Sequence, residues 1–264
     1  MAYPLAGHTN SYHTYGFDDA LAGIAAAGFK GVELSAVPGW TEHVDLDDDP
    51  ADVRRKVEEH GLTAVSLSGH SDLTTRDGLA HGIKAVDWAG RYGLKVVCSA
   101  VGGHESADEN ESAFLANVGE LADAADAAGV VVALEIHGDI MASSDVTLPL
   151  LEKVGRDSIK VNYDTANVEY YSGDTAVDDL PKITGELAHV HLKETTGGKG
   201  NWNFPAVGDG HVDFARVLQI LRDAGYSGPV SVEIEFEGEP WPSLEDVNAA
   251  MRRSYEHLTS LGYR

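Results

Sequence analysis

The stretches GRYGLKVVCS (90–99) and DAAGVVVALE (126–135) decide the fold, because each contains a helix end, a glycine and a short apolar run. A glycine just past a helix is the expected C-cap, and a short run rich in Val, Ile and Leu is typical of a buried parallel strand. The same order recurs in three more places: AAAGFKGVEL (25–34), EEHGLTAVSL (58–67) and RDAGYSGPVSVE (222–233). Helices and buried strands are therefore predicted to alternate along the chain.

Extending this pattern predicts eight strand-then-helix units. The strands are expected near 3–8, 29–35, 62–68, 94–100, 130–136, 158–163, 187–193 and 229–235. The helices are expected near 17–27, 50–60, 74–92, 108–128, 144–154, 175–183, 213–224 and 243–261. Eight units of about 33 residues favour an α/β protein with a closed (β/α)8 TIM barrel, as one domain over 1–264. The absence of a GxGxxG motif after the first strand, and of any P-loop motif, argues against nucleotide-binding open sheets.

The chain is strongly acidic, with 43 Asp and Glu against 19 Lys and Arg and a formal net charge of −24. Such a surface repels nucleic acid and anionic membranes, so neither is expected as a partner. We interpret the charge as an adaptation to a salt-rich, halophilic cytoplasm, where ions screen the repulsion. An ordinary acidic protein is the alternative.

Targeting signals are not evident in the sequence. The N-terminal MAYPLAGHTN lacks the basic and apolar regions of a signal peptide, and no apolar run approaches the ~20 residues of a membrane span. Cys98 is the only cysteine, which excludes an intrachain disulfide, and its apolar neighbours predict a buried position. We therefore expect a soluble, cytoplasmic protein.

Polar residues gather where the predicted strands end, which is where a barrel of this kind places its active site. They are His8, Glu33, His70, His104, Glu135, His137, Asp164, Asn167, His189, His191, Lys193, Glu233 and Glu235. Carboxylates and imidazoles converging at one barrel mouth would repel each other or remain unpaired without a cation. A mixed carboxylate and imidazole set predicts one divalent metal ion, with Mn²⁺ first and Mg²⁺, Co²⁺ or Zn²⁺ as alternatives.

Several of these residues have a structural alternative. His8 could cap a strand, Glu33 could pair with a lysine, and His104 could lie in a solvated loop. We expect His189 and His191 to alternate across their strand, so that only one of them faces the pocket. Glu233 and Glu235 share one strand face, and alternation alone does not choose between them.

Five motifs in order resemble the sugar isomerase/epimerase family with the xylose-isomerase-like barrel. They are ALEIHG (133–138), NYDTAN (162–167), HVHLKE (189–194), GDGHVDF (208–214) and YSGPVSVEIEFEG (226–238). The resemblance covers most of the chain and identifies the metal ligands as Glu135, Asp164, His191 and Glu233. It also implies a carbohydrate substrate and proton abstraction next to a carbonyl, with the metal stabilising the developing enediolate. Glu135 and Glu233 would be the catalytic acid and base.

The resemblance leaves the reaction open. Ketose epimerases of the family often carry a histidine where this chain has Asn167, and an arginine soon after the ligand histidine, where the nearest cations here are Lys193 and Lys199. The HLK sequence is closer to the inosose dehydratase branch. An isomerase or epimerase of a small sugar is the first hypothesis, and a dehydratase acting on a cyclic keto-sugar is the second. A non-catalytic sugar-binding subunit is the third.

Further residues are predicted to contact the substrate, namely His70, His137, Asn167, Lys193 and Trp202. The segment 194–212 is expected to form a loop above the site, where Trp202 and Phe204 could exclude water. The alternative is a loop that packs on a second subunit of a homo-oligomer. The glycines at 197–200 lack the helix of a phosphate cradle, so we expect an unphosphorylated substrate.

Overall fold

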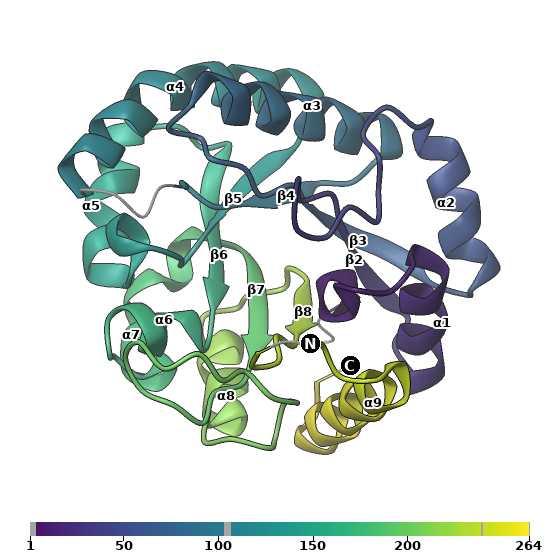
Figure 1. Ribbon diagram of the computed structural model, residues 1–264. Helices are drawn as coiled ribbons and strands as arrows, with labels where there is room; N and C mark the ends of the chain where they lie inside the picture. The colour runs from purple at the N-terminus through teal and green to yellow at the C-terminus, as the bar shows by residue number, and fades with distance from the viewer. Residues whose placement is uncertain (1–3, 103–106, 239, 264) are drawn as a thin grey trace.

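The computed structural model describes residues 4–102, 107–238 and 240–263. Within them, eight strands form a closed parallel barrel in sequence order (Figure 1). The barrel closes where β8 pairs with β1. The strands are β1 (Leu5–His8), β2 (Gly31–Ser35), β3 (Thr63–Ser68), β4 (Val96–Ser99), β5 (Val131–Glu135), β6 (Ile159–Asp164), β7 (Leu187–Lys193) and β8 (Val230–Glu233). The predicted (β/α)8 TIM barrel is confirmed.

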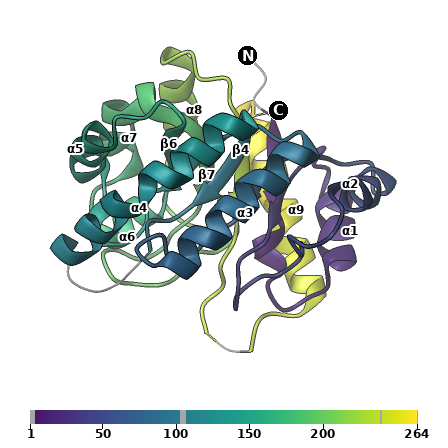
Figure 2. The ribbon, with the colours of Figure 1, turned by 90° about the horizontal axis from the view of Figure 1, so that it is seen from above.

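Helices surround the barrel and connect its strands (Figures 1 and 2). They are α1 (Phe17–Ala27), α2 (Pro50–Glu59), α3 (Arg76–Tyr92), α4 (Ala107–Ala128), α5 (Ser144–Val154), α6 (Asn167–Tyr171), α7 (Ala176–Ile183), α8 (Phe214–Asp223) and α9 (Leu244–Leu261). Short 3-10 turns add η1 (Thr9–Tyr12), η2 (Asp139–Met141) and η3 (Thr184–Glu186). All eight predicted helices are present, and α6 is an addition just past β6. The C-terminal α9 packs against α1 and closes the ring of helices.

The glycines that signalled the fold end helices as expected. Gly28 ends α1 with φ 115°, and Gly93 ends α3 with φ 95°. A side chain is strained in this left-handed region, so glycine is the residue that lets the chain turn back toward the next strand.

The apolar core lies mainly between the barrel and its helices. Trp88 on α3, Phe114 on α4 and Phe214 on α8 are all fully buried there. Cys98 is also buried, as predicted, and packs with Val96 and Ala133 in a small separate cluster. Small side chains at these strand positions leave room inside the barrel for polar groups.

Two register shifts occur next to those polar groups. The pairing of β2 with β3 shifts between Val32 and Glu33, and that of β6 with β7 shifts between Val161 and Asn162. An extra residue in one strand re-aims the side chains that follow it. The shifts bring Glu33 beside Ser66 and Asn162 beside His189 in the strand register.

Two further sequence expectations can be compared with the structure only within the described residues. His104 lies outside the described residues, so its predicted place at the end of β4 is not described. Within the described parts of the chain, none of the helices combines the length and apolar character that crossing a bilayer requires.

Candidate active site

Four buried side chains meet at the carboxyl end of the barrel. Glu135 ends β5, Asp164 ends β6, His191 lies in β7 and Glu233 ends β8. One ligand-type atom from each lies within 4.8 Å of the others. Parallel strands in register bring these residues to the same depth, since Asp164 pairs with His191 across β6 and β7. These are the four residues that the resemblance identifies as metal ligands.

His191 is at the centre of this group. Its Nδ1 lies 3.4 Å from Glu135 Oε2, 3.5 Å from Glu233 Oε2 and 3.8 Å from Asp164 Oδ2. All four side chains are almost fully buried, so three carboxylates lie close together with little exposure to solvent. Such a group needs a positive charge at its centre.

Asp164 carries the clearest sign of a missing partner. Its Oδ1 accepts hydrogen bonds from the backbone N–H groups of Ala166 and Asn167, both at 2.8 Å. Its Oδ2 is buried and has no hydrogen-bond partner among the described residues. Burial raises the pKa of Asp164 to about 7; Lys193 opposes this, and the nearby carboxylates of Glu135 and Glu233 add to it. An unpartnered oxygen among two more carboxylates and an imidazole fits a divalent cation that accepts O and N ligands.

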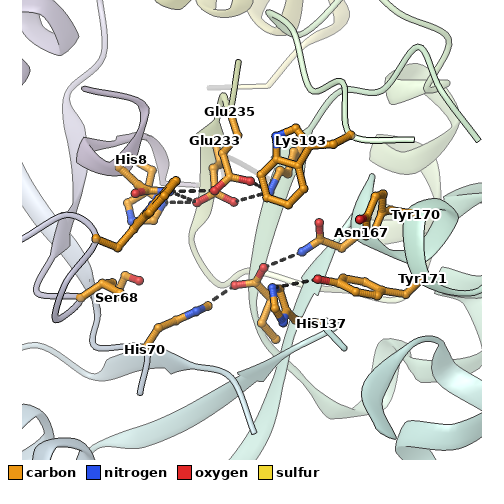
Figure 3. Close-up of a pocket in the computed structure, with 15 residues that line it drawn as sticks. His8, Ser68, His70, His137, Asn167, Tyr170, Tyr171, Lys193, Glu233 and Glu235 are labelled. Carbon is orange, nitrogen blue, oxygen red and sulfur yellow. Dashed lines mark hydrogen bonds and ion pairs between the residues drawn. The ribbon is translucent and has the colours of Figure 1, made fainter. Parts of the chain in front are cut away.

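Glu135 is held by neutral and basic side chains around it. His70 Nε2 lies 2.9 Å from its Oε2, and Asn167 donates a 2.8 Å hydrogen bond to its Oε1 (Figure 3). Burial acts to raise the pKa of Glu135, but the adjacent His70 and His191 outweigh burial and lower it. Glu135 is therefore an ionised carboxylate, able to accept a proton.

Glu233 and Glu235 have different surroundings, which separates them. Glu233 Oε1 lies 2.9 Å from His8 Nδ1, and its Oε2 lies 3.2 Å from Lys193 Nζ. Glu235 forms its closest contact with Lys193, and Asn10 donates hydrogen bonds to both glutamates. Only Glu233 belongs to the group around His191. Of the two glutamates, Glu233 is therefore the one that lies in the predicted ligand group.

These groups line a pocket of about 520 Å³ at the barrel mouth (Figure 3). All five predicted substrate contacts, His70, His137, Asn167, Lys193 and Trp202, are among its lining residues. Sequence reasoning did not single out several others: Asn10, Val37, Trp40, Ser68, Tyr170 and Tyr171. Except for Ser68, these residues lie in loops, turns and the short α6 rather than at the end of an apolar run. Ser68 does end a strand, but it is uncharged and so did not stand out as a site residue.

The loop after β7 covers Lys193. Nζ of Lys193 lies 4.5 Å from the ring centroid of Phe204 and 5.9 Å from that of Trp202. Trp202 and Phe204 contact each other edge to face, and Tyr170 of α6 packs on both. Phe204 is fully buried while Trp202 remains 38% exposed, so the aromatic cluster forms one wall of the pocket and its outer edge faces solvent.

The expectation that His189 and His191 alternate across their strand was wrong. Residues two apart share a strand face, and both imidazoles point into the barrel at different depths. His189 Nδ1 contacts Asn162 Oδ1 at 3.0 Å, and its Nε2 lies 3.1 Å from both Ser66 Oγ and Ser231 Oγ. His189 thus belongs to a polar layer below the pocket. Glu33 joins this layer through the two histidines rather than through a lysine.

Comparison with known proteins finds a sugar-phosphate epimerase of similar sequence. L-ribulose-5-phosphate 3-epimerase UlaE of Salmonella typhi is 28% identical over 187 residues, which cover 69% of this chain. The match spans 65% of the length of that relative.

Solved structures share the fold over almost the whole chain. D-allulose 3-epimerase from Methylomonas sp. is 24% identical with a TM-score of 0.75, covering 99% of this chain and 100% of its own. A xylose isomerase-like TIM barrel protein from Mycobacterium smegmatis in complex with magnesium is 16% identical with a TM-score of 0.76, covering 98% and 97% of the two chains. The model of the xylose isomerase-like TIM barrel family matches residues 21–261. The chain therefore belongs to the xylose isomerase-like TIM barrel family.

Proposed function

We propose that this protein is a divalent-metal-dependent epimerase or isomerase of a small sugar. The observation that carries the proposal is the buried group of Glu135, Asp164, His191 and Glu233 at the floor of the pocket. Family membership and the 3-epimerase name of the curated relative support the same reaction class.

These four residues would hold the metal, with Mn²⁺ as the first choice and Mg²⁺, Co²⁺ or Zn²⁺ as alternatives. When bound, the ion would supply Lewis-acid stabilisation of the negative charge that develops on a substrate carbonyl. The donor set of three carboxylates and one imidazole, with the unpartnered Asp164 Oδ2 among them, supports this assignment.

Glu135 and Glu233 would carry out the proton transfers. They extend from β5 and β8, two strands that are not neighbours in the barrel, and both carboxylates approach Nδ1 of His191. A sugar carbon bound between them would present one face to each carboxylate. Although burial opposes it, neighbouring cations and histidines lower the pKa of both groups, so both are ionised and either can accept a proton. One would remove a proton next to the carbonyl and later release it to solvent. The other, after taking up a proton from solvent, would return it to the opposite face or the adjacent carbon.

The remaining pocket residues would bind and orient the substrate. His70 and Asn167 contact Glu135, so a hydroxyl that approaches this carboxylate meets hydrogen-bonding groups on both sides. His137 is held by Tyr171, whose hydroxyl lies 3.0 Å from its Nε2. Trp202 would shield the reacting carbons from water.

A dehydratase is the second candidate, and Lys193 is the observation that favours it. Its buried ammonium lies 3.2 Å from Glu233, where it could protonate a leaving hydroxyl. Burial opposes the charged form, yet the carboxylates of Glu233, Glu235 and Asp164 raise the pKa of Lys193 well above its ordinary value. Family membership and the 3-epimerase name of the curated relative favour epimerisation, so we rank dehydration second.

The net charge of −24 supports one more part of the proposal, that the protein works in a salt-rich cytoplasm. Activity and stability measured from low to high KCl test it. A protein adapted to salt should become more active and more stable as the KCl concentration rises.

The function is tested by metal content and product analysis. Elemental analysis should find about one metal per chain in the wild type and none in His191→Ala, whereas His60→Ala, on the far end of α2, should retain it. The loaded protein should convert a ketose into its 3-epimer or an isomer, resolved by chromatography. An ultraviolet-absorbing product would favour the dehydratase. Absence of metal uptake together with absence of turnover would instead favour a sugar-binding subunit.

A further inference from the structure

The described pocket offers no free positive charge to a substrate. Lys193 is the one Lys or Arg among its lining residues, and its ammonium is shared by Glu233 and Glu235. The lining also includes Glu135, and Asp164 lies directly beneath. Even with a divalent ion bound, the three lining carboxylates and Asp164 outweigh or balance the positive charge, so a phosphate group would gain no net attraction here.

The usual phosphate position of this type of barrel is filled by the protein itself. In TIM barrels, phosphate commonly binds to backbone N–H groups in the loops after the seventh and eighth strands. Here the buried carboxylate of Glu194 accepts hydrogen bonds from Thr195 N and Val212 N through Oε1, at 3.0 and 2.9 Å. Its Oε2 accepts another from Gly208 N at 2.9 Å. Glu194 thus takes the anion's place among these donors.

Two helix starts near the mouth, those of α6 and α9, are engaged in the same way. Asp164 Oδ1 accepts from the backbone N–H groups that open α6. At the start of α9, Ser243 accepts from the backbone N–H of Asp246, and the first turn carries two acidic residues. Backbone donors at these positions therefore meet internal acceptors or carboxylates, which repel a second anion.

The loop after β7 contains one further cation, Lys199, which lies apart from the pocket. Its side chain is exposed and does not line the cavity. The backbone beside it is also engaged, since Gly200 N donates to the carbonyl of Tyr170 at 2.9 Å. Within the glycine-rich segment 197–200, the N–H groups of Gly197 and Gly200 are therefore both engaged by other parts of the protein.

We infer that the sugar bound by this pocket is uncharged, and that the site discriminates against phosphorylated sugars. This inference rests on the proposed epimerase or isomerase function and narrows its substrate class. It separates the chain from the relative whose name specifies L-ribulose 5-phosphate. The aromatic side chains of Trp40, Tyr170 and Trp202 on the pocket wall suit the apolar faces of a neutral sugar.

Paired substrates test the inference directly. The metal-loaded protein is assayed with L-ribulose against L-ribulose 5-phosphate, and with D-allulose against D-allulose 6-phosphate. For whichever pair reacts, kcat/KM for the free sugar should exceed that for its phosphate by at least about a hundredfold, because like charges brought together cost several kcal/mol. Millimolar inorganic phosphate should neither inhibit turnover nor raise the Tm.

Lys199→Ala serves as the matched variant, because Lys199 is the exposed lysine of the loop after β7. It should leave the preference for the free sugar unchanged. Equal or better turnover of the phosphate would overturn the inference while leaving the proposed function intact, and loss of that turnover in Lys199→Ala would identify the phosphate contact. If none of the four sugars reacts, the proposed function fails, and the inference fails with it.

Discussion

Glu33 Oε2 lies 3.0 Å from Nε2 of His191, on the side of the imidazole opposite the three carboxylates that surround its Nδ1. Asn162 fixes the direction of these bonds. Its Oδ1 faces His189 Nδ1, so its NH₂ group donates to Glu135 and to His191 Nδ1, at 3.3 and 3.2 Å. A ring nitrogen that ligates a metal carries no proton, so with Nδ1 of His191 facing the predicted metal site the ring proton would lie on Nε2, facing Glu33.

Glu33 should therefore act as a positioning residue for the metal site. A carboxylate behind a ligand histidine fixes its tautomer and raises its basicity, and losing such a partner costs about 10- to 100-fold in metal affinity. Glu33→Gln should weaken Mn²⁺ binding by this factor in calorimetry and change the His191 tautomer seen by ¹⁵N NMR. Glu58→Gln, on the exposed face of α2, is the control. Unchanged affinity and an unchanged tautomer would show that Glu33 serves packing alone.

Glu135 and Glu233 should affect turnover more than binding. Replacing either by Gln keeps its size but removes the proton acceptor. General acid–base catalysis by one such group typically raises the rate by about 10²–10⁴-fold. We expect kcat to fall by at least about a hundredfold in each variant, with a smaller change in KM. Metal content must be measured alongside, and the exposed Glu152→Gln provides the reference. A variant Glu135→Gln with full turnover would exclude its catalytic role.

The Lys193 and Glu235 pair should show strong coupling in stability. Removing one partner of a buried ion pair leaves an uncompensated charge and costs about 3–5 kcal/mol. Lys193→Met should lower the free energy of unfolding by this amount in urea titrations, while Glu235→Gln should cost less because Glu233 still faces the ammonium. The double variant should be less destabilised than the sum. Additive effects would mean that the two side chains do not depend on each other.

His189 should make the protein sensitive to acid. Burial lowers the pKa of His189 to about 4, whereas the unfolded chain has a value near 6.5. Below pH 6.5 the imidazole of His189 binds a proton in the unfolded state but not in the folded state. The free energy of unfolding therefore falls as the pH drops toward 4, and the contribution of His189 then levels off. The loss is about 3 kcal/mol, from 1.36 kcal/mol per pKa unit.

Asp and Glu side chains titrate in the same pH range as His189. The measurement therefore compares wild type with His189→Gln by urea unfolding from pH 6.5 to 4. The wild type should lose more stability over this interval than the variant. Parallel curves would indicate that His189 titrates normally in the folded protein.

The architecture could be predicted from local signals. Gly28 and Gly93 mark helix ends, and the apolar runs after them mark strands buried on both faces, so the eight units could be counted along the chain. Because parallel strands all end at the same rim, the polar residues that follow them had to meet there. For this reason the polar residues at the strand ends could be grouped from the sequence, and the family resemblance then selected Glu135, Asp164, His191 and Glu233 among them.

Which side chains contact one another inside the barrel was decided only by the tertiary structure. Register shifts beside Glu33 and Asn162 decide which side chains share a layer, and these arise between strands that are distant in sequence. The pairing of Glu33 with His191 spans 158 positions, and that of Asn10 with Glu233 spans 223. A sequence reports the periodicity of each element, because that depends on near neighbours. Hydrogen-bond partners across the barrel are set only when all eight strands close, since closure fixes their relative depth.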